Sequence, residues 1–139
     1  MYDVADSVQY EKLRAFSNIK LNGFVSDKTQ IYNSIHCVLH ASLFEPLGRI
    51  FLEAIYFNRP LIGISNAGIG EIGGMLNLTT LLADMRESDI GRSLLDKLIF
   101  LADNYETIVS DIISKKIFAA QIFNPVQYAD RIDSLMRPV

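Results

Sequence analysis

The sequence predicts an α/β fold: a three-layer, Rossmann-like parallel sheet of about four short strands with helices on both faces. Short apolar runs alternate with longer amphipathic stretches, at the spacing that is typical of parallel sheets. The runs at 37–41 and 61–64 are short, apolar and partly β-branched, as expected for strands that are buried on both faces. Half of the 139 residues are apolar and 21% are charged, which suits one ordinary domain with a real core.

The elements follow one another in a regular order. The predicted strands cover residues 19–21, 37–41, 61–64 and 79–82. One predicted helix ends near residue 16, and the others cover residues 26–32, 48–57, 88–104, 105–122 and 125–136. Ser26 and Asp27 can cap the start of a helix, and Pro60 ends another because proline disfavours helical backbone just before itself. Four glycines in 66–74 predict a loop there, with one helical turn at most.

Composition excludes several classes of protein. The net charge is −3 and there is no long basic run, so we expect no nucleic-acid partner. Cys37 is the only cysteine, which leaves no disulfide framework and no thiol metal cluster. The first eight residues carry two Asp, unlike a signal peptide, and no apolar stretch has the length of a membrane span. These features predict a cytoplasmic protein.

Topology brings three loops to one edge of the predicted sheet. In open parallel sheets, ligands bind beyond the carboxyl ends of the strands. Residues 23–25, 42–48 and 66–70 each follow a predicted strand and should line one crevice.

The run from Phe44 to Glu53 carries the clearest chemistry. Its N–H groups at the helix start can hold a phosphate, and Gly48 lets that phosphate approach the backbone. Glu53 lies five residues beyond Gly48, about 7.5 Å along the helix axis, where a carboxylate can accept from both hydroxyls of a ribose. Glu45 precedes the helix and could bind sugar hydroxyls.

This run and its surroundings resemble the signature of glycosyltransferase family 4. An apolar strand ending in Ser42 is followed by Glu-Pro-Leu-Gly at 45–48, by Glu53, by a strand after Pro60, and by Glu-Ile at 71–72 after a glycine-rich stretch. Residues 21–27 resemble the loop that holds the nucleotide base in that family, and residues 123–135 resemble its closing helix. Leu47 stands where the family more often has Phe.

The resemblance implies a GT-B fold and a metal-independent, retaining transferase that uses a nucleotide-diphosphate sugar and no cofactor. It assigns Glu45 to the donor sugar as the catalytic residue and Glu53 to the ribose. The backbone of Leu47, Gly48 and Arg49 would contact the diphosphate and sugar, and Phe24 and Val25 would contact the base. Assembly of cell-surface polysaccharide is the role that the family suggests.

The resemblance covers only the later part of the carboxyl-terminal, donor-binding domain of such enzymes. We therefore expect residues 1–139 to form a single partial domain, closed by helices at about 105–137. The segment that carries the cationic diphosphate ligands and the acceptor-binding domain have no counterpart here, so the chain alone should be inactive.

The same gap predicts an exposed sheet edge at 37–41. Either residues 19–21 pair beside it or the chain self-associates there. A non-catalytic α/β module that acts through a partner chain is the alternative function. A phospho-receiver domain is disfavoured because the strand at 37–41 ends in His-Ala-Ser.

Overall fold

The structure is a computed structural model that describes residues 8–124. The chain divides into two compact units, residues 1–31 and residues 32–139. The first unit contains helix α1 (Val8–Arg14) and the start of α2 (Lys28–Asn33). Both predicted helices are thereby confirmed. Asp27 Oδ1 accepts hydrogen bonds from the backbone N–H groups of Thr29, at 2.9 Å, and Gln30, at 3.4 Å, as a helix cap does.

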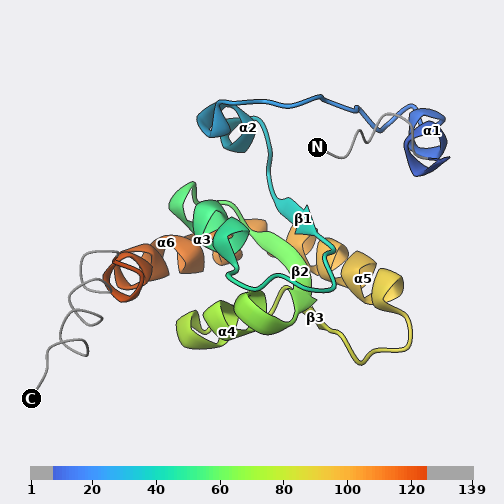
Figure 1. The fold of residues 1–139 in the computed structure, drawn as a ribbon. Coiled ribbons are helices and arrows are strands. Elements are labelled where there is room, and N and C mark those ends of the chain that lie inside the picture. The colour runs from blue at the N-terminus through green and yellow to red at the C-terminus, as the bar shows by residue number, and fades with distance from the viewer. Residues whose placement is uncertain (1–7, 125–139) are drawn as a thin grey trace, which may run out of the picture. The chain divides into compact units, whose positions relative to one another are not determined.

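The second unit contains a parallel sheet of three strands in the order β1-β2-β3 (Figure 1). Its strands are β1 (Val38–His40), β2 (Leu61–Ser65) and β3 (Leu82–Asp84). Val38 pairs with Leu61, and Gly63 pairs with Leu82. Its helices are α3 (Arg49–Tyr56), α4 (Ala67–Leu76), α5 (Ile90–Asp103) and α6 (Tyr105–Ile122).

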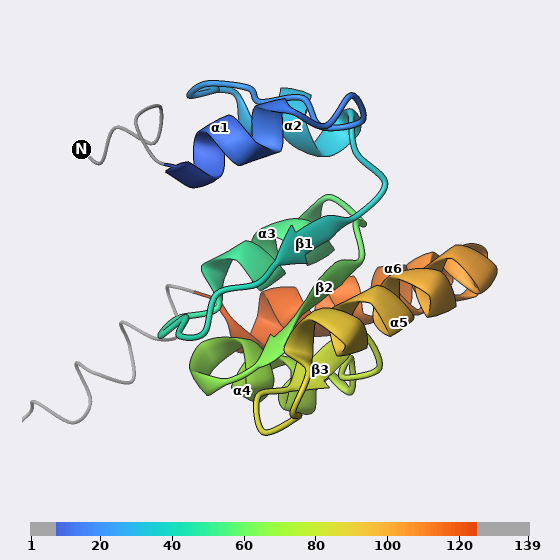
Figure 2. The same cartoon turned by 90° about the vertical axis from the view of Figure 1, so that its right-hand side faces the viewer.

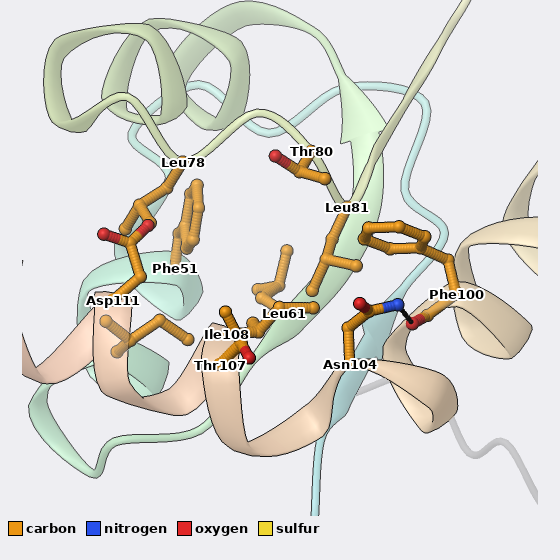
Figure 3. Close-up of a pocket in the computed structure, with 11 residues that line it drawn as sticks. Phe51, Leu61, Leu78, Thr80, Leu81, Phe100, Asn104, Thr107, Ile108 and Asp111 are labelled. Atoms are coloured by element: carbon orange, nitrogen blue, oxygen red, sulfur yellow. Dashed lines mark hydrogen bonds between the residues drawn. The ribbon is translucent and has the colours of Figure 1, made fainter.

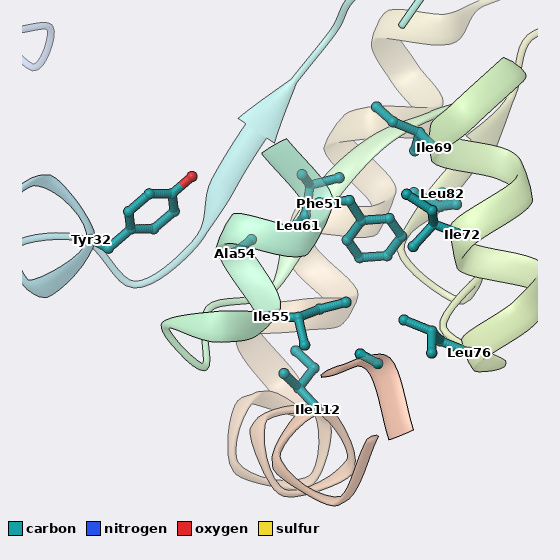
Figure 4. Packing of buried hydrophobic residues seen from close by; sticks show 11 residues of the cluster. Tyr32, Phe51, Ala54, Ile55, Leu61, Ile69, Ile72, Leu76, Leu82 and Ile112 are labelled. Atoms are coloured by element: carbon teal, nitrogen blue, oxygen red, sulfur yellow. The ribbon is translucent and has the colours of Figure 1, made fainter. Parts of the chain in front are cut away.

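Two apolar clusters on opposite faces of β2 make this unit three-layered (Figure 2). One joins Leu61 of β2 to α3, α4 and α6 through buried side chains such as Phe51, Ile72 and Ile112, and Phe51 and Ile72 point toward each other in Figure 4. The other joins Ile62 to Leu101 of α5. Successive strand residues face opposite sides of a sheet, so an unbroken apolar strand fills both clusters. The predicted α/β class is confirmed.

The predicted loop at 66–74 is wrong, because the structure has the ten-residue helix α4 there. Each interior glycine costs a helix roughly 1 kcal/mol relative to alanine. Against that cost, Ile69, Ile72 and Leu76 are buried, and burial of each such side chain contributes about 1.5–3 kcal/mol. Tertiary packing therefore outweighs the local preference of the glycines.

The predicted strand at 19–21 is also wrong, since residues 19–21 have no strand pairing. Three residues make too few ladder hydrogen bonds to hold an extended strand without a neighbouring strand. Within residues 8–124, the strand recorded beside β1 is β2. Self-association at that edge stays a prediction.

The remaining boundaries are close to the predicted ones. β3 begins at Leu82, three residues later than predicted, while α6 covers the predicted 105–122. The predicted helix at 125–136 lies outside the described residues. Within residues 8–124, no helix has both the length and the apolar character that crossing a membrane requires.

Candidate functional site

Two of the three segments predicted to converge, 42–48 and 66–70, meet at the carboxyl edge of the sheet, and the second of them is the start of α4. Asn66, which is 7% exposed, joins them. Its Nδ2 donates to the Ser42 carbonyl at 3.0 Å, and its Oδ1 accepts from the Glu45 N–H at 3.4 Å. The Gly68 N–H donates to the Glu45 carbonyl at 3.0 Å. The backbone of Glu45 is therefore fixed through both its N–H and its C=O.

Gly48 and Gly68 allow the starts of α3 and α4 to touch. Gly48 caps α3 with φ +57°, a left-handed conformation that glycine adopts readily. A Cβ at Gly48 would lie 2.7 Å from the Gly68 oxygen, and a Cβ at Gly68 would lie 2.5 Å from the Gly48 nitrogen. The structural role of Gly48 therefore differs from the predicted one, because the side on which other residues carry a Cβ faces α4 and is not open to a ligand.

Glu45 lies beside a histidine. Its Oε2 is 3.7 Å from Nε2 of His40, the last residue of β1, and both side chains are about three-quarters buried. His40 Nε2 is buried and has no hydrogen-bond partner within the described residues. The proximity of His40 to Glu45 was not predicted from the sequence.

Glu53, in the middle of α3, accepts a hydrogen bond from a buried phenol. Tyr32 Oη donates to Glu53 Oε2 at 3.3 Å. The Tyr32 ring stacks on Phe57 with centroids 4.6 Å apart, and the Tyr32 carbonyl accepts from Arg59 Nε at 2.8 Å. Burial, and then the charge and the hydrogen bond of Glu53, raise the pKa of Tyr32 from its ordinary 10.0 to about 12.

This shift predicts an alkaline weakening of the fold. The folded state favours the neutral phenol, so the stabilisation is fully present below pH 10 and is lost as the pH rises from 10 to 12. Thermal melts across that window should show a smaller fall in Tm for Tyr32→Phe than for the wild type. Tyr56→Phe, at an exposed tyrosine on the same side of the fold, is the control and should follow the wild type. An unchanged alkaline slope in Tyr32→Phe would contradict the assignment.

The other predicted site residues are less enclosed. Leu47 and Arg49, on either side of Gly48, are exposed. Within the described residues, the N–H groups of Arg49 and Ile50 have no backbone acceptor, as expected at a helix start. Phe24 and Val25 belong to the first unit, in the stretch before α2. Their contact with a base stays a prediction.

Sequence reasoning missed three features, two of which lie at this edge. Asn66 was placed only in a loop, although an Asn directly after a buried strand is a natural loop clamp. Tyr32 was treated as the end of a helix. Asp84 ends β3 at the same edge, and hydrogen bonds from Arg86 lower the pKa of Asp84 to about 2.

An apolar cavity of about 400 Å³ lies at the other end of the strands. Leu61, the first residue of β2, and Thr80 and Leu81, which precede β3, line it (Figure 3). The rest of its lining comes from α3, α5, α6, the residue between α5 and α6, and the 77–81 connection: Phe51, Leu78, Phe100, Asn104, Thr107, Ile108, Asp111 and Ile112. The cavity is therefore separate from the edge that holds Glu45. Within the described residues, no three His, Cys, Asp or Glu side chains gather as metal ligands would.

A family model described as glycosyl transferases group 1 matches residues 4–104. This chain belongs to the group 1 glycosyltransferase family. The match covers the Glu45–Gly48 run, Glu53 and the clamp at Asn66, and it ends after α5. Comparison with curated proteins and with solved structures gave no significant match. The family indicates glycosyl transfer as the general activity and an incomplete GT-B, Rossmann-like domain as the fold.

Proposed function

We propose that this group 1 glycosyltransferase chain is the donor-binding part of a retaining, family 4 type enzyme and holds a nucleotide-diphosphate sugar. The observation that carries the proposal is the arrangement of Glu45 and Glu53 about the start of α3. Glu45 is fixed in the loop before the helix, and Glu53 is the fifth residue of the helix, about 6 Å along the axis from Arg49.

Each part of the donor has a group of suitable chemistry. The diphosphate is assigned to the backbone of Leu47, Gly48 and Arg49, where the helix start supplies N–H groups and positive potential. Because Gly48 is buried against α4, the exposed residues on either side of it make the closer contacts. Glu53 receives the ribose hydroxyls and Glu45 the sugar hydroxyls. The base is assigned to Phe24 and Val25.

We further propose that the 139-residue chain does not transfer the sugar by itself. The leaving diphosphate develops negative charge, and stabilisation of that charge is a major part of catalysis. This proposal includes no metal and no cofactor. The cationic side chains that neutralise the diphosphate, and the site that binds the acceptor, are assigned to a partner domain.

Calorimetry with UDP-, GDP- and ADP-sugars tests both statements. We expect one of these donors to bind at millimolar concentration or below, and no acceptor-dependent transfer by the purified chain. Transfer by the chain alone would refute the second statement. No binding of any donor at millimolar concentration would refute the first.

An open sheet edge favours the alternative, a non-catalytic module that associates with a partner chain. Val38 donates to the Pro60 carbonyl at 2.9 Å, so the backbone of Leu39, the next residue, faces away from β2. The Leu39 side chain is 60% exposed. Under this alternative, light scattering should detect an assembly larger than the monomer, and Leu39→Pro should dissolve it.

A further inference from the structure

The environment of the His40 ring nitrogen Nε2 is unusual for a buried polar atom. His40 Nε2 is buried from solvent and makes no hydrogen bond within the described residues. Buried polar atoms in proteins are nearly always paired, so an exception requires an explanation. The nearby polar group is the Glu45 carboxylate, whose Oε2 lies 3.7 Å away, too far for a hydrogen bond.

The backbone on both sides of this gap is fixed. β1 holds His40 opposite Gly63, and Glu45 is bound through its N–H by Asn66 and through its C=O by Gly68. The Glu45 side chain can therefore rotate while its backbone stays in place. A shift of the carboxylate by about 1 Å brings Oε2 within the usual hydrogen-bond distance of Nε2.

We propose that His40 is the positioning residue of Glu45. When the nucleotide sugar is bound, the Nε2–H of His40 donates a hydrogen bond to Glu45 Oε2. This hydrogen bond turns the other carboxylate oxygen of Glu45 toward a hydroxyl of the sugar. Because Nε2 is buried, His40 acts through Glu45 and does not touch the sugar. The inference rests on the proposed function and adds to it a residue that controls recognition of the sugar but not of the nucleotide.

Calorimetry on the full chain with two ligands tests the proposal. A nucleoside diphosphate lacks the sugar that Glu45 contacts, whereas the nucleotide sugar contains it. We expect His40→Ala to weaken binding of the nucleotide sugar about tenfold and binding of the nucleoside diphosphate less than about twofold. His40→Gln, whose side-chain amide nitrogen can take the place of Nε2, should keep most of the affinity.

Non-additivity gives a second readout. Adding His40→Ala to Glu45→Ala should cause no further loss of affinity, because His40 acts only through Glu45. The control is His36→Ala, at an exposed histidine that lies against Tyr105, and it should bind both ligands as the wild type does. Equal loss of both ligands in a folded His40→Ala chain would indicate a merely structural role and overturn the proposal.

Nitrogen NMR of the histidine side chains keeps the proposal testable if His40→Ala does not fold. We expect His40 to carry its proton on Nε2, and we expect its signals to shift in Glu45→Gln. A proton on Nδ1 alone would overturn the proposal while leaving donor binding intact. A wild-type chain that binds neither ligand would instead overturn the proposed function, and this inference with it.

Discussion

Gly68→Ala should be among the most destabilising single substitutions in this chain, costing about 3 kcal/mol of the free energy of unfolding. The added Cβ would lie 2.5 Å from the Gly48 nitrogen, 2.6 Å from the Leu47 carbonyl carbon and 2.7 Å from the Pro46 oxygen. All three are backbone atoms, so no side chain can rotate away to relieve the overlap. The helix starts must separate, and the loop that carries Glu45 must move with them.

Gly74→Ala is the matched control, in the same helix. A Cβ there would meet nothing within 4 Å, so the usual preference of a helix for alanine should raise stability by roughly 0.5–1 kcal/mol. Urea unfolding of the two variants and the wild type measures both changes through the transition midpoint. Equal stability of the two variants would show that α3 and α4 do not touch as described.

Glu53→Gln should have the second large effect, a loss of donor affinity of about 10- to 100-fold. A hydrogen bond to a charged group contributes about 1.5–3 kcal/mol, and the amide replaces a double acceptor with one acceptor and one donor. The loss should be the same for a nucleoside diphosphate and for the nucleotide sugar, because both contain the ribose. This separates Glu53 from Glu45, whose removal should affect only the nucleotide sugar.

Glu71→Gln, in α4, is the control for the loss of one negative charge, since Glu71 is exposed. Calorimetry should give an affinity within about twofold of the wild type for it. Comparable losses in Glu53→Gln and Glu71→Gln would mean that the change in net charge, and not the ribose contact, sets the affinity. Thermal melts show whether Glu53→Gln also lowers the stability of the fold through loss of the Tyr32 hydrogen bond, so that a fall in affinity from that cause is recognised.

The elements that the sequence predicted well are those whose pattern is local. The boundaries of α6 were predicted correctly, because its start follows Asn104 directly after α5. β2 is an unbroken apolar run after a proline, and burial on both faces is what such a run indicates. In each case the neighbouring residues already contain the signal.

The errors arise where distant residues decide. α4 is helical although it contains Gly68, Gly70, Gly73 and Gly74, because Ile69, Ile72 and Leu76 are buried, and a Cβ at Gly68 would lie 2.5 Å from the Gly48 nitrogen. Composition alone cannot reveal that the space beside a glycine is occupied. The strand expected at 19–21 fails for the opposite reason, because a strand requires a partner that its own residues do not specify.

The candidate site likewise has parts that the sequence predicted and parts that depend on distant residues. The spacing of Glu45 and Glu53 and the position of the helix between them follow from the sequence, and the structure has α3 starting at Arg49. The partners His40 and Tyr32 come from 5 and 21 residues away, across a strand end and a separate helix. No periodicity in the sequence marks those two pairs.

The close approach of Gly48 and Gly68 also has an electrostatic consequence. It places the amino ends of two helices against each other, and the partial positive charges of their peptide dipoles add at one point. Peptide dipoles do not titrate, unlike lysine or histidine side chains. The contribution of these dipoles to the attraction of an anion should therefore persist across the physiological pH range.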